Sequence, residues 1–221
     1  MGKSIAIDGP AGAGKSTIAK LVAKELGFIY VDTGAMYRAM ALYLLRKGID
    51  RNDVAGIEKA CEDADISITF KDSRQVVLLM GEDVNEYLRT EEVGNMASMS
   101  SVNPKVREKL VSLQQKLAAE KDVVMDGRDI GTVVLPNSPC KIYLTASSKV
   151  RAQRRYDELK AKGEECDLDK IEADIIERDN RDMTREHSPL KQADDAVLID
   201  SSYMTIEEVK DAIIAEAKGK L

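Results

Sequence analysis

Residues 9–16 (Gly-Pro-Ala-Gly-Ala-Gly-Lys-Ser) match the pattern GxxxxGK followed by Ser or Thr, and this segment constrains the fold more than any other. An apolar run at residues 4–7 precedes it, and an amphipathic stretch at 16–26 follows it. Small residues let backbone N–H groups wrap a phosphate, and the helix N-terminus adds partial positive charge. We therefore expect a phosphate-binding loop in which Lys15 reaches the β- and γ-phosphates and the Ser16 hydroxyl ligates Mg²⁺. A glycine-rich turn without a ligand is the alternative, and the flanking strand and helix disfavour it.

Four more apolar runs have the length of strands and are separated by helical stretches. They are continuous rather than alternating, which is typical of parallel strands buried on both faces, and they lie at residues 28–31, 123–125, 141–144 and 196–199. We expect Gly27 to end the first helix, Asn103 and Pro104 to open a later one, and a capping box of Thr205 and Glu208 to open the last. This alternation of strands and helices predicts an α/β fold.

One stretch departs from this rhythm and predicts a β-hairpin. Residues 66–70 alternate in polarity, residues 71–74 form a polar turn, and residues 75–80 resume as an apolar run. A hairpin does not belong to a parallel sheet, so we assign about residues 62–95 to an inserted lobe with a small antiparallel sheet. The chain of residues 1–221 is otherwise interpreted as a single domain.

Composition excludes several classes of function. The 221 residues carry 33 Lys and Arg against 39 Asp and Glu, and the net charge of −6 argues against a nucleic-acid coat. No apolar stretch approaches the roughly 20 residues of a membrane span, and the N-terminal residues lack a signal-peptide core, so we expect a cytoplasmic protein without membrane contact. Three cysteines without metal-ligand spacing argue against a disulfide framework or a zinc site. With His187 as the only histidine, expected in a loop, catalysis by several histidines is excluded.

Arginines are concentrated in two segments that follow the strand run at 141–144. The first set comprises Arg151, Arg154 and Arg155, on a helix that we expect Ser147 to cap. The second set is expected on one helical face and comprises Arg178, Arg181, Asp182 and Arg185, at i, i+3, i+4 and i+7. Guanidinium groups stay charged and bind phosphate oxygens in pairs, so two such helices are suited to clamp a phosphoryl group. A solvated charged face is the alternative, and the neighbouring phosphate-binding loop favours a lid over about residues 149–186.

Two further clusters begin where predicted strands end. They are residues 32–38 (Asp-Thr-Gly-Ala-Met-Tyr-Arg) and 126–132 (Asp-Gly-Arg-Asp-Ile-Gly-Thr). Parallel strands bind ligands at their carboxyl ends, so both clusters are expected beside the phosphate-binding loop, although turns built only for backbone geometry are the alternative. Asp126 fits either an acid on the Mg²⁺ side or a simple strand cap, and both interpretations stay open. The chain has no Asn-Lys-x-Asp motif, which argues against a GTPase.

Together these motifs resemble those of the bacterial cytidylate kinases, which are nucleoside monophosphate kinases with a P-loop. The segments IDGPAGAGKST, DTGAMYR, GRDIGT and ERDNRDMTRE carry the resemblance, in the family's order, between residues 5 and 186. The resemblance implies a three-layer P-loop fold with a five-stranded parallel sheet, an inserted lobe that binds the monophosphate, and an arginine-rich lid. It also implies ATP as the phosphoryl donor, CMP and dCMP as acceptors, Mg²⁺ as the metal, no nucleic-acid partner, and a monomer.

The resemblance assigns roles to individual residues. The residues that would hold ATP are Gly9, Pro10, Ala11, Gly12, Ala13, Gly14, Lys15, Ser16 and Thr17, together with Arg154 and Arg155. The residues that would bind the acceptor nucleotide are Thr33, Tyr37, Arg38, Ser98, Arg107, Asp129, Arg178, Asp182 and Arg185. Of these, Ser98, Arg107 and Asp129 would contact the cytosine. The catalytic residues that would neutralise the transferring phosphoryl group are Lys15, Arg128, Arg178 and Arg185, and Ser16 would ligate the metal.

The chemistry of the residues agrees with a cytosine base. A carboxylate such as Asp129 accepts from the cytosine N4 amine but faces the uracil O4 unfavourably, and an arginine donates to N3 and O2. A monophosphate is largely dianionic at neutral pH, so the transfer needs positioning and charge neutralisation rather than a general base. The alternatives are a kinase for another acceptor, such as a different nucleoside monophosphate or shikimate, and a module that binds ATP without phosphotransfer. Thr33 leaves the preference between CMP and dCMP open.

Overall fold

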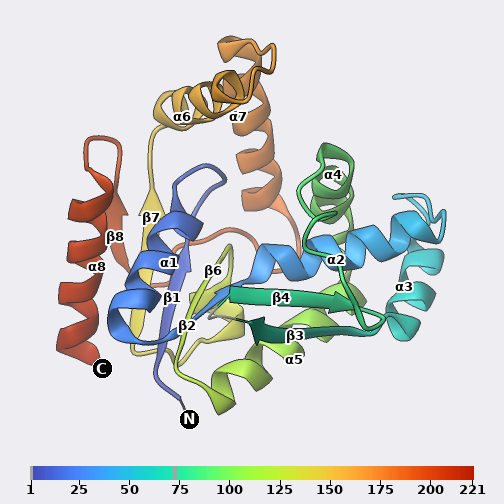
Figure 1. The fold of residues 1–221 in the computed structure, drawn as a ribbon, viewed down its shortest axis with the longest axis horizontal. Helices are drawn as coiled ribbons and strands as arrows, with labels where there is room; N and C mark the ends of the chain where they lie inside the picture. Colours follow the sequence, from blue (N-terminus) through green and yellow to red (C-terminus); the bar gives the residue numbers. More distant parts are fainter. Residues whose placement is uncertain (1, 72–73) are drawn as a thin grey trace.

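The chain is built on a parallel sheet. The computed structural model describes residues 2–71 and 74–221, and within them a five-stranded sheet has the strand order β2-β6-β1-β7-β8. Every neighbouring pair is parallel, so the carboxyl ends of the strands share one edge (Figure 1). The strands are β1 (Ser4–Asp8), β2 (Ile29–Asp32), β6 (Val123–Gly127), β7 (Cys140–Thr145) and β8 (Val197–Asp200). The predicted α/β fold with this sheet is confirmed.

Helices cover both faces of the sheet, which explains the continuous apolar runs. Ile5 and Ile7 of β1 belong to the core on one face and Ala6 to the core on the other, and all three are fully buried. The first core is completed by α1 and α8, and the second by α2 and α5, so the main body has three layers. The bounds of these helices are α1 (Lys15–Leu26), α2 (Thr33–Arg46), α5 (Pro104–Glu120) and α8 (Ile206–Lys220).

Local signals set the ends of three helices as predicted. Gly27 ends α1 in the left-handed conformation. The Asn103 side chain accepts two backbone N–H groups at the start of α5, and Pro104 occupies the first turn, where its missing N–H costs nothing. Thr205 and Glu208 form both hydrogen bonds of a capping box on α8.

A second, antiparallel sheet lies beside α2 and has the order β3-β4-β5. The pairing runs from Ile66 opposite Leu79 to Lys71 opposite Arg74, which confirms the predicted hairpin. Its strands differ at the ends from the prediction, because Lys71 and Arg74 pair as strand residues and β4 ends at Leu79, before Met80. Residues 72 and 73 of the predicted turn lie outside the described residues. The Gln75 side chain exchanges hydrogen bonds of 2.8 and 3.1 Å with the backbone of Asp32, which fastens this sheet to the end of β2. The elements here are α3 (Val54–Asp63), β3 (Ile66–Lys71), β4 (Arg74–Leu79), β5 (Glu82–Asp83) and α4 (Glu91–Ser100).

Two packed helices, α6 (Ser148–Ala161) and α7 (Leu168–Thr184), project beyond the carboxyl edge of the sheet (Figure 1). Ser147 caps α6 as predicted. The prediction that Arg185 shares a helical face with Arg178 is wrong, because α7 ends at Thr184 and Arg185 has extended backbone. The Arg185 Nε instead donates to the Ser188 carbonyl oxygen at 2.6 Å. Arg181 forms an ion pair with Glu177 at 2.9 Å, as a solvated face would.

Three expectations drawn from composition concern residues that the structure describes. None of the helices in residues 2–71 and 74–221 combines the length and apolar character that crossing a bilayer requires. The cysteines are free thiols, with Cys61 and Cys140 buried and Cys166 half-buried. His187 lies exposed in a bend after α7, as predicted for a loop residue.

Two glycines with positive φ provide a matched test of backbone packing. A Cβ added to Gly9 (φ 148°) would lie 1.9 Å from the Leu144 carbonyl oxygen, whereas one added to Gly27 (φ 71°) meets none of the described residues within 4 Å. We expect Gly27→Ala to lower the free energy of unfolding by about 1–2 kcal/mol, the cost of left-handed backbone. Gly9→Ala adds a backbone clash, so it should cost at least about 2 kcal/mol more, or prevent folding. Urea denaturation measures both, and equal losses would contradict the close approach at Gly9.

Candidate active site

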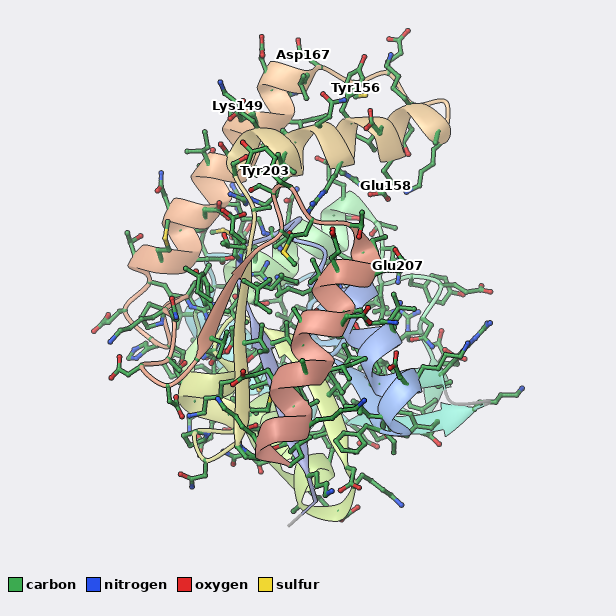
Figure 2. All side chains as sticks on the ribbon, turned by 90° about the vertical axis from the view of Figure 1, so that its left-hand side faces the viewer. Lys149, Tyr156, Glu158, Asp167, Tyr203 and Glu207 are labelled. Atoms are coloured by element: carbon green, nitrogen blue, oxygen red, sulfur yellow. The ribbon has the colours of Figure 1, made fainter. Side chains whose placement is uncertain are left out.

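The strand register brings the sequence clusters together at the carboxyl edge of the sheet. Asp8 of β1 is level with Gly127 of β6 and Tyr143 of β7, and Asp32 of β2 is level with Asp126. The segments that follow β1, β2 and β6 therefore line one cavity of about 800 Å³. Figure 2 labels Glu158 on α6, above, and Glu207 at the start of α8, below, and both helices contribute residues to the cavity wall.

Nearly all residues singled out in the sequence line this cavity. Those in its wall are Ala11, Gly12, Ala13, Gly14, Lys15, Ser16, Thr17, Thr33, Tyr37, Arg38, Ser98, Arg107, Arg128, Asp129, Arg154, Arg155, Arg178, Asp182 and Arg185. Gly9 and Pro10 do not belong to the wall. They shape the loop from behind, because Gly9 packs against the backbone of β7 and the Pro10 carbonyl accepts from Lys15 Nζ at 2.7 Å.

The Lys15 side chain is folded back onto its own loop and is almost fully buried. Its burial and the nearby Arg128 guanidinium lower the pKa of Lys15 well below the usual value for lysine, against the opposing pull of Asp126 and Asp8. Within the part of the chain that the structure describes, the Lys15 ammonium has the Pro10 carbonyl as its hydrogen-bond partner and forms no ion pair with a carboxylate. It is therefore ready to bind an anion held by the loop.

Asp126, at the end of β6, is the centre of a small hydroxyl cluster. It accepts from Ser16 Oγ at 2.8 Å and from the Tyr30 hydroxyl at 2.8 Å. Burial and the neighbouring Asp32 raise the pKa of its carboxyl. Since the carboxylate faces the loop and the Ser16 hydroxyl, the structure places it beside the metal ligand expected from the sequence.

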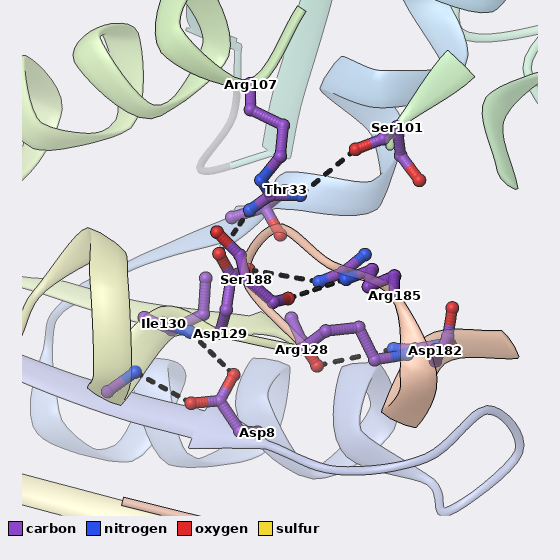
Figure 3. A network of polar contacts seen from close by, with 12 residues as sticks. Asp8, Thr33, Ser101, Arg107, Arg128, Asp129, Ile130, Asp182, Arg185 and Ser188 are labelled. Atoms are coloured by element: carbon purple, nitrogen blue, oxygen red, sulfur yellow. Dashed lines mark hydrogen bonds and ion pairs between the residues drawn. The ribbon is translucent and has the colours of Figure 1, made fainter. Parts of the chain in front are cut away.

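A buried ion pair lies on the α5 side of the cavity. Arg107 of α5 donates to the Asp129 carboxylate, and the side chains of both are about nine-tenths buried (Figure 3). The Arg107 guanidinium also lies 5.6 Å from the centre of the Tyr37 ring and donates to the Ser101 carbonyl at 3.3 Å. Arg185 approaches from the other side, with its Nη2 4.0 Å from Asp129 Oδ1. Asp129 is thus presented between two guanidinium groups.

A second ion pair joins the residue that follows β6 to α7. Arg128 Nε donates to Asp182 Oδ2 at 2.8 Å (Figure 3). Burial opposes ionisation of Asp182, but Arg128, followed by Arg178 and Arg185, holds its pKa below the usual carboxyl value. Arg178 itself has no hydrogen-bond partner for Nε among the described residues, and burial together with Arg128 lowers its pKa to about 10. Three guanidinium groups, those of Arg128, Arg178 and Arg185, thus surround the single carboxylate of Asp182. This part of the cavity therefore carries a net positive charge.

The remaining predicted side chains differ in how free they are to bind a ligand. The Thr33 hydroxyl donates to the Asp126 carbonyl at 2.7 Å, so it is already used by the backbone of β6. The Tyr37 hydroxyl has no hydrogen-bond partner among the described residues, and burial raises its pKa to about 12. Arg154 Nη2 donates to the Ser201 carbonyl at 2.8 Å, and Arg155 pairs with Glu158 at 3.0 Å.

Two more charged residues support the site: Asp8, which the sequence patterns did not assign to it and which lies outside the cavity wall, and Arg151, which they assigned to the lid and which lines the wall. Asp8 accepts the backbone N–H groups of Ile130 and Gly131, both at 2.7 Å. Its position at the end of a buried strand, directly before the phosphate-binding loop, is the only sequence signal that points to it. Arg151 of α6 donates to the carbonyls of Ala146 and Ala11, at 2.8 and 3.0 Å, and it also pairs with a carboxylate of α7.

The sequence of this chain is similar to those of cytidylate kinases over nearly its full length. The family model for cytidylate kinase matches residues 5–219. A cytidylate kinase from Caldicellulosiruptor saccharolyticus is 53% identical over 211 residues, which cover 96% of this chain and 93% of the relative. One from Geobacter sp. (strain M21) is 47% identical over 220 residues, which cover 100% of this chain and 94% of the relative.

Among solved structures, an uncharacterized protein from Eubacterium ventriosum is similar at a TM-score of 0.52 and 12% identity, and the match covers 100% of both chains. At that identity the likeness supports the fold alone. The family rests on the sequence matches, which extend over nearly the full length of each protein. The chain therefore belongs to the cytidylate kinase family.

Proposed function

We propose that this protein catalyses the ATP-dependent phosphorylation of CMP and dCMP to CDP and dCDP, by in-line transfer of the γ-phosphoryl group, in pyrimidine nucleotide metabolism. Membership of the cytidylate kinase family supports the reaction and implies ATP as the donor. The structural observation that carries the proposal is one cavity lined both by a P-loop and by a buried arginine–carboxylate pair. The first recognises phosphates and the second suits a cytosine.

The donor would bind at the P-loop. Backbone N–H groups of residues 11–17 at the N-terminus of α1 would form the phosphate cradle, with Gly9 and Pro10 shaping the loop behind it, and Lys15 would add a buried ammonium. Arg154 and Arg155 would reach the ATP phosphates from α6 at the mouth of the cavity. Met204, Ile206 and Val209 add apolar wall beside them, which suits a flat base.

The acceptor would bind between α2, α5 and β6. The Asp129 carboxylate would accept from the cytosine N4 amine, Arg107 would donate to N3 and O2, and Ser98 would add a polar contact. Tyr37 supports Arg107 through the cation–π contact. The residues proposed to hold the ribose and phosphate are Thr33, Arg38, Arg178, Asp182 and Arg185.

The transfer itself needs charge neutralisation more than proton transfer. The monophosphate arrives largely as a dianion, so its oxygen is already a nucleophile. Burial and the nearby Arg128 guanidinium lower the pKa values of Lys15 and Arg178, and the arriving phosphates would relieve the repulsion among these cations. A surplus of buried cations thus stabilises the charge that develops on the phosphoryl oxygens.

The residues around Ser16 fit a magnesium ion. Ser16 Oγ and the Asp126 carboxylate are hard oxygen donors within 2.8 Å of each other. Within the described residues no three His, Cys, Asp or Glu side chains gather to hold a metal, so phosphates and water would complete its coordination. When bound, the ion would neutralise charge on the donor phosphates and orient them.

Three organisational features belong to the same proposal. The antiparallel sheet and its neighbours, about residues 62–95, would form a lobe on the acceptor side. The helices α6 and α7, within about residues 149–186, would form a lid that excludes water from the γ-phosphoryl group. We propose that the protein acts as a monomer in the cytoplasm.

A panel of acceptors tests the function directly. Coupled ADP-release assays with ATP should show turnover of CMP and dCMP that greatly exceeds turnover of UMP, AMP or shikimate, because only cytosine matches the Asp129 and Arg107 pair. Turnover of AMP without turnover of CMP would contradict the proposal. A module that only binds ATP would release no ADP with any of the five acceptors.

Exchanging the base-reading carboxylate for an amide should change the preferred base. Asp129→Asn keeps the volume and offers an NH₂ group that can donate to the uracil O4. We expect kcat/KM for CMP to fall about 10- to 100-fold and the UMP-to-CMP ratio to rise by about tenfold or more. The KM for ATP in the same variant is the internal control and should change less than about twofold. An unaltered base ratio would show that Asp129 does not contact the base.

Removing the P-loop ammonium should affect transfer rather than folding. Lys15→Met is expected to lower kcat by about 10²–10³-fold, since a buried charge near the γ-phosphate is lost. Burial already lowers the pKa of Lys15, so the neutral variant should keep its thermal stability. Lys24→Met, an exposed position on the same helix, is the matched control. Wild-type turnover in the Lys15 variant would contradict the role of the loop.

A further inference from the structure

Asp8 is a buried carboxylate that the transfer mechanism does not use. It is 4% exposed, it ends β1, and it does not line the cavity. Both of its oxygens accept backbone N–H groups: Oδ1 from Ile130 and Oδ2 from Gly131, each at 2.7 Å (Figure 3). The contact joins residues more than 120 positions apart, so it is a tertiary contact and not a local turn.

The two N–H groups belong to the segment that presents the base-reading carboxylate. The Ile130 N–H lies in the same rigid peptide plane as the Asp129 carbonyl. From Ile130 to Val134 the chain forms η1, a short π-helix whose first turn returns Val133 N–H to that carbonyl at 2.9 Å. Asp8 therefore fixes the peptide plane that leaves the Cα of Asp129, and with it the direction of the Asp129 side chain toward Arg107.

The surroundings leave this plane little freedom. A Cβ added to Gly131 would lie 3.4 Å from Asp8 Oδ2 and 3.2 Å from Lys141 Cδ. The Ile130 side chain is 1% exposed and fills the space above Gly127. Among the described residues, the only hydrogen bonds between η1 and β1 are the two that the Asp8 carboxylate accepts.

We propose that Asp8 is a positioning residue for the acceptor base: by holding the Asp129–Ile130 peptide plane, its carboxylate sets the discrimination between cytosine and uracil. The inference rests on the proposed function, since Asp129 must read the base. It concerns a residue that touches neither nucleotide.

Electrostatics support a functional reason for the charge. Burial is the main cause that raises the pKa of Asp8 to about 6, and Asp129 adds to it, while the two backbone N–H groups and Lys15 oppose it. When the pKa of a carboxyl group is higher in the folded than in the unfolded protein, the folded protein loses stability as the pH rises from the unfolded pKa through the folded pKa. The ionised Asp8 therefore costs stability at neutral pH, and a neutral amide in its place should fold.

The decisive variant is Asp8→Asn, which keeps the shape but turns one acceptor into an NH₂ group that faces an N–H donor. We expect KM for CMP to rise and the CMP-to-UMP ratio of kcat/KM to fall about tenfold or more, with KM for ATP changed less than about twofold. Asp122→Asn is the matched control, because Asp122 also accepts a backbone N–H, that of Lys3 at 2.6 Å, but at the opposite end of the same strand pair. It should leave the base ratio unchanged.

A purely structural role would look different. A variant that only lowered the folded fraction would reduce turnover of CMP and UMP by one factor and would leave their ratio and KM values unchanged. That result overturns the inference while the proposed function stands. If the unaltered protein phosphorylates neither CMP nor UMP, both are overturned.

The unaltered protein supplies a second measurement that does not depend on a variant folding. The CMP-to-UMP ratio of kcat/KM should fall as the pH drops from 7 to 5, because Asp8 takes up a proton near pH 6 and loses an acceptor. Titration of the substrate phosphates cancels in this ratio, since both nucleotides carry the same group. The titratable groups that face Asp8 are Lys15 on α1, Asp129 before η1 and Tyr143 on β7. A ratio that stays constant between pH 5 and 7, or an acid decline that persists in Asp8→Asn, overturns the inference.

Discussion

The pairing of β1 with β6 and β7 is the interaction on which the rest of the structure depends. It sets Asp8 level with Gly127 and Tyr143, and it buries Ile5 and Ile7 on one face and Ala6 on the other. In a parallel sheet the connections at one edge all follow strand ends, so this register delivers the phosphate-binding loop and the residues of β6 to the same place. A shift by one residue would turn the core positions of β1 to the wrong faces and separate the charged groups.

The net charge of −6 describes the average of the chain and not its cavity. The cavity wall carries Lys15 and eight arginines against five carboxylates, those of Asp32, Asp126, Asp129, Glu158 and Asp182. Burial, and after it the neighbouring guanidinium groups, lower the pKa values of Lys15, Arg178 and Arg185, so the protein holds these three cations at a cost in folding free energy. Anionic substrates would remove that cost when they bind, and the acidic surplus of the chain lies outside this wall.

The elements set by local chemistry could be predicted from the sequence, and those set by distant contacts could not. The buried strands, the caps at Gly27 and Asn103, and the P-loop all follow from a few adjacent residues. The helical spacing of the arginines predicts that α7 continues through Arg185, but the helix ends at Thr184. The Arg185 guanidinium donates to the Ser188 carbonyl, a contact that spacing does not indicate. The engagement of the Thr33 hydroxyl and of Asp8 depends on partners about 90 to 120 residues away, which no local pattern encodes.

Arg151 of α6 connects the phosphate-binding loop to α7. The loop belongs to the main body, whereas α6 and α7 would move relative to that body if they closed over a nucleotide. The Arg151 guanidinium holds the Ala11 carbonyl of the phosphate-binding loop at 3.0 Å and the Asp179 carboxylate of α7 at 2.6 Å, and the side chain is buried. A buried charge that loses its partner is far less stable than either the intact pair or a neutral pair. Loss of either partner alone should therefore loosen the helices from the phosphate-binding loop far more than replacement of both by neutral residues, so this one pair ties the position of the lid to the shape of the loop beneath it.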